Sequence, residues 1–72
     1  MHDRKQVYAR LWECTDRLGM IELSQLEMAD RLGIPYQRLS IIYTEFQKAG
    51  YMKKYRHKFQ MKNPIDVDWE TT

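Results

Sequence analysis

Residues 24–50 read SQLEMADRLGIPYQRLSIIYTEFQKAG, and this stretch contains the signals for two helices joined by a short turn. Ser24 followed by Glu27 is the pattern of a capping box, in which two side chains satisfy free backbone N–H groups at a helix start. Gly33 suits the left-handed residue that ends a helix, because it has no Cβ to clash. The stretch therefore predicts a first helix over residues 24–32.

A second helix is expected directly after the turn. Pro35 suits the first helical turn and Gly50 the end, so this helix spans residues 36–49. Apolar residues recur along it at intervals of three and four, the spacing of one buried face, at Leu39, Ile42, Tyr43 and Phe46. The opposite face holds Gln37, Arg38, Ser40, Ile41, Thr44 and Gln47.

The two helices carry the residues that a helix-turn-helix needs at their crossing. Gly33 can take the positive φ of the turn, and Ala29 is small where the second helix packs across the first. Ile34 fills the turn, and Leu39 faces back into the corner. The first helix is expected to bury Leu26, Ala29 and Leu32, with Met28 beside them.

After Gly50 the pattern changes from helical to alternating, which is typical of strands. Residues 51–55 and 58–62 flank Arg56 and His57, and they predict a hairpin with these two residues at its tip. Asn63-Pro64 follows as the hairpin's end. No acidic residue lies between residues 46 and 65, where the basic residues are Lys48, Lys53, Lys54, Arg56, Lys58 and Lys62.

An amphipathic helix is expected at the N-terminal end, over residues 4–18. Asp3 and Gln6 have the spacing of a capping box, and Gly19 is the expected C-terminal stop. The short segment at residues 20–23 is expected to lie extended. The buried stripe of the helix is expected to hold Val7, Leu11, Cys14 and Leu18.

Two features each have two interpretations. Tyr8 and Trp12 form a second stripe beside the first, which either widens the core face or makes a dimer contact. Residues 65–72 form either a third strand or an ordered arm, because apolar and acidic side chains alternate there. We therefore divide the chain into a domain of residues 1–64 and an acidic C-terminal arm of residues 65–72.

Residues 23–34, continuing into Leu39-Ser40 and residues 45–52, resemble the winged helix-turn-helix family of bacterial and phage regulators. The resemblance covers residues 21–61. It implies a mainly α fold with a small β hairpin (an α+β class), in which three helices pack on a two- or three-stranded sheet. Pro35 departs from the family, which usually places a Ser or Thr cap there.

The resemblance also implies that the recognition helix, residues 35–49, enters the major groove of double-stranded DNA while the wing, residues 51–62, touches the backbone. Gln37 can pair with adenine and Ile41 can meet a thymine methyl group. The candidate recognition residues are Tyr36, Gln37, Arg38, Ser40, Ile41 and Thr44. The candidate wing contacts are Lys53, Lys54, Arg56, His57 and Lys58. The alternative for the polar residues of the helix is ordinary solvated surface.

Composition narrows the classes of function. A chain of 72 residues is one small domain, and no apolar run reaches the roughly 20 residues of a membrane span. The single cysteine, Cys14, cannot form an internal disulfide, so a cytoplasmic location is expected. His2, Cys14 and His57 lack metal-ligand spacing. No catalytic constellation or glycine-rich phosphate loop is present, so we expect no enzyme activity, cofactor, metal or small-molecule ligand.

The net charge of +2 divides unevenly along the chain. Residues 1–63 hold twelve lysines and arginines against seven acids, a balance of +5, and residues 64–72 hold three acids and no base. A basic hairpin beside a helix-turn-helix predicts a non-enzymatic DNA-binding protein that acts as a small transcriptional regulator. The alternative is a winged-helix module that binds another protein, such as host transcription or replication machinery. A homodimer through Tyr8, Trp12 or the arm is a further expectation.

Overall fold

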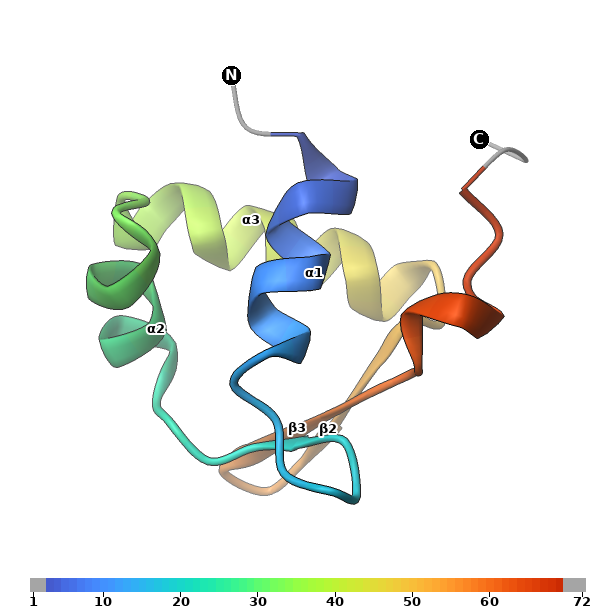
Figure 1. Ribbon diagram of the computed structural model, residues 1–72. Helices are drawn as coiled ribbons and strands as arrows, with labels where there is room; N and C mark the ends of the chain where they lie inside the picture. The colour runs from blue at the N-terminus through green and yellow to red at the C-terminus, as the bar shows by residue number, and fades with distance from the viewer. Residues whose placement is uncertain (1–2, 70–72) are drawn as a thin grey trace.

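The computed structural model describes residues 3–69 of the chain. Within them, three helices pack above a three-stranded antiparallel sheet, which is the winged-helix-like α+β architecture expected from the sequence (Figure 1). The helices are α1 (Arg4–Trp12), α2 (Gln25–Leu32) and α3 (Tyr36–Lys48). The strands are β1 (Met20–Ile21), β2 (Met52–Tyr55) and β3 (Lys58–Met61), and the 3-10 helix η1 (Pro64–Asp66) follows them.

The helix-turn-helix forms as its local signals predict. The Ser24 side chain accepts a hydrogen bond from the Glu27 N–H, and the Glu27 carboxylate accepts one from the Ser24 N–H, which completes the capping box. Gly33 ends α2 with φ of 68°. Ile34 then donates its N–H to the Ala29 carbonyl at 3.0 Å, so the turn is tied to the last helical carbonyls.

The start of α3 at Tyr36 matches the prediction, but the role of Pro35 does not. Pro35 occupies the N-cap rather than the first turn, and its side chain makes no capping hydrogen bond. The helix therefore begins at Tyr36 with the N–H groups of its first turn uncapped by a side chain. It ends at Lys48, with Ala49 as C-cap, one residue earlier than expected.

The prediction for α1 was wrong at its C-terminal end. The helix stops at Trp12 instead of continuing to residue 18, and Gly19 lies in the following turn rather than at a helix end. The Asp16 carboxylate accepts hydrogen bonds from the N–H groups of Leu18 and Met20 at 2.8 and 3.0 Å, and these bonds hold a turn that a helix cannot accommodate. They also keep the pKa of Asp16 below its usual value.

Two further details of the predicted helices were wrong. Asp3 does cap α1, because its carboxylate accepts the Lys5 N–H, but Gln6 does not complete a capping box. On α2, Leu26 was expected in the core but is 65% exposed, because it lies on the side of the helix that faces solvent. The residues that α2 buries are Met28, Ala29 and Leu32.

The sheet has the strand order β1-β3-β2, with both neighbouring pairs antiparallel. The hairpin of β2 and β3 matches the prediction, with Tyr55 opposite Lys58 and the tip at Arg56 and His57. The third strand is the short β1, which pairs Ile21 with Phe59. The residues after β3 form η1 and an ordered arm instead of a strand, and residues 70–72 lie outside the described part.

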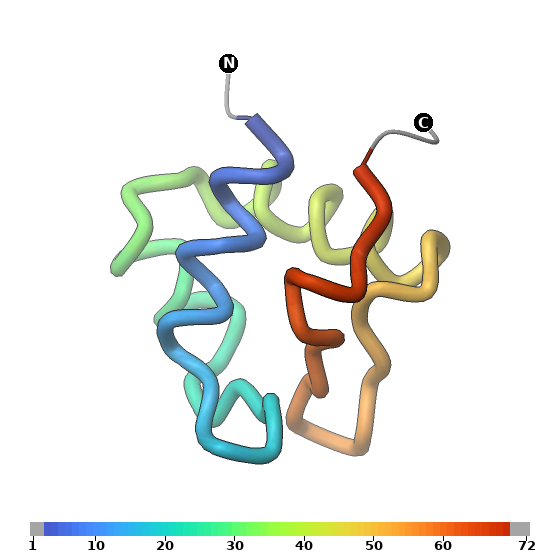
Figure 2. The backbone as a smooth tube through the Cα atoms, turned by 45° about the vertical axis from the view of Figure 1, so that its right-hand side comes forward, coloured from blue at the N-terminus to red at the C-terminus, as the bar shows by residue number. Residues whose placement is uncertain are grey.

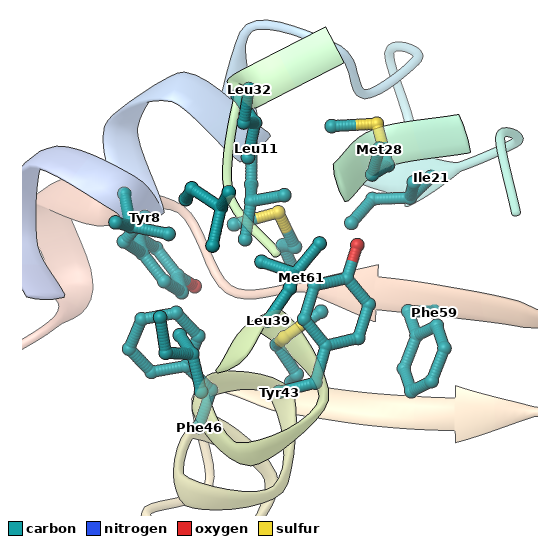
Figure 3. Close-up of a cluster of buried hydrophobic side chains, with 14 of the residues drawn as sticks. Tyr8, Leu11, Ile21, Met28, Leu32, Leu39, Tyr43, Phe46, Phe59 and Met61 are labelled. Atoms are coloured by element: carbon teal, nitrogen blue, oxygen red, sulfur yellow. The ribbon is translucent and has the colours of Figure 1, made fainter. Parts of the chain in front are cut away.

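The core lies between the three helices and the upper face of the sheet, where aliphatic, aromatic and methionine side chains interdigitate (Figure 3). The buried stripe of α3 is confirmed, since Leu39, Ile42, Tyr43 and Phe46 are all buried. Two members of the stripe predicted on α1 differ. Leu18 is 68% exposed, and Cys14 is half-buried at the edge of the core.

Tyr8 belongs to the core, which settles its two interpretations in favour of packing. Its ring is fully buried and meets Phe46 and Trp69 edge-on, with centroids 5.1 and 5.3 Å away. Val67 is buried as well, so the described part of the arm packs on the domain beside α1 (Figure 2). Trp12 is half-buried against the core.

The two buried tyrosines make the fold sensitive to alkaline pH. Burial raises the pKa of Tyr8 to about 12 and also raises the pKa of Tyr43. In the unfolded chain both ionise near 10, so between pH 10 and 12 the unfolded state has released protons that the folded state keeps. Stability should therefore fall as pH rises through this range, by about 1.4 kcal/mol per pH unit for each tyrosine.

Urea unfolding at half-unit steps from pH 8 to pH 11 checks this expectation. The unfolding midpoint should fall most steeply above pH 10, and the Tyr43→Phe variant should lose part of that slope. A midpoint that stays constant across the range would show that neither hydroxyl resists ionisation in the folded protein.

Candidate nucleic-acid interface

The outward face of α3 is set by the helix's core contacts. Leu39, Ile42, Tyr43 and Phe46 point inward, so the residues about half a turn away point to solvent. The structure accordingly exposes five of the six residues predicted to contact DNA and leaves Ser40 half-buried. The exposed residues are Tyr36, Gln37, Arg38, Ile41 and Thr44.

The hairpin lies along one side of this face, and α1 lies along the other. Ser40 and Gln47 lie in the row of Tyr43, whose ring packs on Phe59 of the hairpin with centroids 4.9 Å apart. That row faces the wing. On the other side, Glu45 accepts a hydrogen bond from the guanidinium of Arg4 in α1 at 2.6 Å.

Arg4 brings a second guanidinium, besides that of Arg38, to the outward face of α3. It lines a hollow of about 340 Å³ together with Gln37, Arg38 and Ile41. Sequence reasoning missed Arg4, because it belongs to a helix 41 residues away from its partner Glu45. Its only sequence signal is a basic residue in the first turn of α1, which by itself indicates nothing about α3.

Thr44 is exposed but has less hydrogen-bonding capacity than the sequence implied. Its hydroxyl donates to the carbonyl of Ser40 at 3.0 Å, one turn back along the same helix. Similarly, the side-chain amide of Gln47 donates to the carbonyl of Tyr43 at 3.3 Å. Among the described residues, the Gln37 side chain makes no such bond and remains available to an external partner.

The wing presents its charges to solvent. All five predicted contacts are exposed, namely Lys53, Lys54, Arg56, His57 and Lys58. Lys58 forms an ion pair with Glu22 at 3.2 Å, and Lys53 lies 5.3 Å from the centroid of the Tyr55 ring. Within residues 3–69, Lys58 is the wing residue that has an acidic partner, so most of the tip's positive charge is not neutralised.

Arg56 adopts an uncommon backbone conformation at the tip of the wing. Its φ of 53° lies in the left-handed region, and it is the non-glycine residue of the described chain with a positive φ. Glycine or asparagine would occupy this position with less strain, so arginine here costs roughly 1 kcal/mol of stability. The turn therefore keeps a guanidinium at the tip despite a local energetic cost.

The acidic arm does not cover the wing in the part that the structure describes. Trp69 packs against Tyr8 and Tyr51 with ring centroids 5.3 Å away in each case, near the start of α1 and the end of α3. In Figure 1 the arm rises at the upper right, whereas the tip of the hairpin lies at the bottom. Asp66 and Asp68 are exposed residues of this arm.

An apolar groove of about 660 Å³ lies on the outside of the helix-turn-helix. Leu26 and Tyr36 contribute exposed apolar surface to it, at 65% and 48% exposure. Glu27 and Asp30 supply carboxylates to its lining, and hydrogen bonding to Ser24 keeps the pKa of Glu27 below its usual value. This groove is therefore negatively charged, unlike the wing.

Within residues 3–69, no group of three or more His, Cys, Asp or Glu side chains has an arrangement that would hold a metal ion. None of the described helices combines the length and the apolar character needed to cross a membrane. No protein-family model, curated protein or solved structure matches the chain.

Proposed function

We propose that this protein is a non-enzymatic DNA-binding protein that uses α3 in the major groove and the β2–β3 wing on the phosphate backbone. The observation that carries the proposal is the cationic tip of the wing, where Lys53, Lys54 and Arg56 are exposed without acidic partners among the described residues. Such a cluster attracts a polyanion, because each phosphate contact releases counterions.

Two features of α3 support the same function. Its outward face carries Gln37 and Arg38, whose side chains can reach base edges and phosphates. Its first turn has N–H groups that no side chain caps, and a DNA phosphate at that point would satisfy them. By occupying DNA in this way the domain would regulate transcription.

Salt dependence of duplex binding tests the proposal. A fluorescently labelled random duplex of 25 base pairs should bind at about 50 mM salt, and the logarithm of affinity should fall with the logarithm of salt at a slope of about −3.6 for four neutralised phosphates. The triple variant Lys53→Ala/Lys54→Ala/Arg56→Ala should reduce this slope by roughly 2.7 and weaken binding to all sequences equally.

A charge-matched control separates the wing from net charge. The variant Lys5→Ala/Arg17→Ala/Arg31→Ala removes the same charge from exposed sites on α1, the α1–β1 loop and α2. It should bind with nearly the slope of the unmodified protein. Equal losses in the two triple variants would mean that charge in general, and not the wing, attracts DNA. Absence of binding at low salt would reject the proposed function.

The second candidate function is binding to another protein, and the groove beside Leu26 and Tyr36 favours it. Its apolar lining and two carboxylates suit a partner segment with basic and apolar side chains. The variant Leu26→Lys should abolish such an interaction while leaving duplex binding unchanged or stronger. A homodimer through Trp12 or the arm remains a proposal, which light scattering at micromolar concentration would test; buried Tyr8 offers it no contact surface.

A further inference from the structure

We propose that α3 selects A·T base pairs through the major groove, with Gln37 reading adenine and Ile41 contacting the methyl group of thymine. This inference rests on the proposed function and specifies its ligand. Gln37 and Ile41 lie one turn apart on the outward face of α3, and both line the hollow next to Arg4. They are therefore placed to meet neighbouring base pairs.

The hydrogen-bonding groups left free on this face match A·T rather than G·C pairs. A glutamine amide can both donate to adenine N7 and accept from its N6 amino group. Thr44 has turned its hydroxyl to the Ser40 carbonyl. Glu45 carries the carboxylate that would accept from a cytosine amino group, and it is already paired with Arg4 at 2.6 Å.

Guanine is usually read by an arginine or lysine that reaches its two acceptor atoms from the centre of the face. Here Arg38 lies to the side, in the helical row of the buried Ile42, and lines the same hollow as Arg4. Arg38, which has no acidic partner among the described residues, is placed at the edge of the outward face of α3 to hold a phosphate, which would fix the helix in one register over the bases.

Ile41 supplies the apolar half of the proposed contact. Its side chain is 60% exposed in the middle of a face that is otherwise polar, so the free protein leaves this apolar surface in water. A thymine methyl group in the major groove is the apolar group that duplex DNA offers there. Burying one methyl group against Ile41 should strengthen binding about fourfold.

Base analogues test this contact one atom group at a time. Four 25-base-pair duplexes are compared by fluorescence anisotropy: A·T-rich, the same duplex with uracil in place of thymine, G·C-rich, and inosine·cytosine in place of G·C. Uracil removes only the major-groove methyl group. Inosine·cytosine presents the A·T pattern in the minor groove and the G·C pattern in the major groove, because inosine lacks the guanine amino group.

The unmodified protein should bind the A·T duplex about fourfold more tightly than its uracil form for each methyl group contacted. Ile41→Ala should remove this difference, and Ile65→Ala, which shortens a more exposed aliphatic side chain in η1, should retain it. Gln37→Ala should weaken A·T binding about tenfold and leave G·C binding unchanged. Both α3 positions are exposed, so these variants should fold normally.

The outcomes separate this inference from the proposed function. Salt-dependent binding of equal strength to all four duplexes would overturn A·T selection and leave DNA binding intact. Equal preference for A·T and inosine·cytosine over G·C would overturn it too, because the preference would then come from the minor groove. No binding to any duplex at low salt would reject the proposed function itself.

Discussion

Replacement of Gly19 by alanine should destabilise the protein by about 3 kcal/mol, since a substitution that combines backbone strain with a steric clash lies at the upper end of single-residue effects. Gly19 has φ of 77°, and a Cβ atom placed on it would lie 2.8 Å from the carbonyl oxygen of Met61. The carbonyl oxygen of Gly19 also accepts a hydrogen bond from the Met61 N–H at 2.7 Å. Moving away to relieve the clash would break this bond next to the pairing of β1 with β3.

The other two glycines provide matched controls. Gly33 and Gly50 also have positive φ, at 68° and 83°, but a Cβ atom on either would meet no atom within 4 Å. Alanine at these positions should therefore cost only the backbone strain, roughly 1 kcal/mol.

Thermal and urea unfolding of the three alanine variants measure the difference. For a domain of this size, about 3 kcal/mol corresponds to a fall of roughly 12–24 °C in the melting temperature. If Gly19→Ala loses no more stability than Gly33→Ala and Gly50→Ala, then the close approach of Gly19 to β3 does not constrain the fold.

The parts of the fold that the sequence predicted well are those decided by neighbouring residues. The capping box of Ser24 and Glu27, the positive φ of Gly33 and the alternation around Arg56 and His57 all act within a few residues. Such signals do not depend on the rest of the chain, so α2, α3 and the hairpin were each placed to within about two residues.

The end of α1 was harder to predict, because a contact with a distant strand contributes to it besides a local turn. The apolar spacing continued to Leu18, which made a longer helix consistent with the sequence. In the structure, Asp16 holds a tight turn and Gly19 bonds to Met61, so the chain leaves the helix to place β1 beside β3. A two-residue strand has too little pattern of its own to indicate this pairing.

The candidate site likewise has a part that the sequence predicts and a part that it does not. The exposed face of α3 follows from helical periodicity, so Gln37, Arg38 and Ile41 were expected there. Two features are evident only in the structure, namely Arg4 beside the face and the hydroxyl of Thr44 bonded to its own helix. Both depend on side-chain orientation, which residue spacing alone does not determine. The DNA contacts themselves stay predictions.

Removal of one hydroxyl group from each of two buried tyrosines should change stability in opposite directions. The Tyr8 hydroxyl shares its one proton between the backbone carbonyls of Tyr51, at 3.0 Å, and Lys62, and so ties α1 to the residues that flank β2 and β3. Tyr8→Phe removes the donor to the Lys62 carbonyl, whereas the Tyr51 carbonyl keeps the Lys62 N–H at 2.9 Å. The expected loss is about 2 kcal/mol, the cost of an unsatisfied buried polar group.

The Tyr43 hydroxyl is buried without a hydrogen-bond partner among residues 3–69. The folded state therefore forfeits the bond that this group makes to water in the unfolded chain. Tyr43→Phe removes that penalty and keeps the ring, whose edge-on contact with Phe59 has a centroid distance of 4.9 Å. Stability should rise by about 1–2 kcal/mol.

Urea unfolding of both variants compares the same atomic deletion in two buried environments. Since the ring and its apolar contacts are retained in each variant, only hydrogen bonding and polar desolvation differ between them. Amide hydrogen exchange adds a local measurement, because the Lys62 N–H donates to the Tyr51 carbonyl at 2.9 Å and should exchange faster in Tyr8→Phe. Equal changes of the same sign in both variants would mean that packing, and not the bonds of Tyr8, joins α1 to the wing.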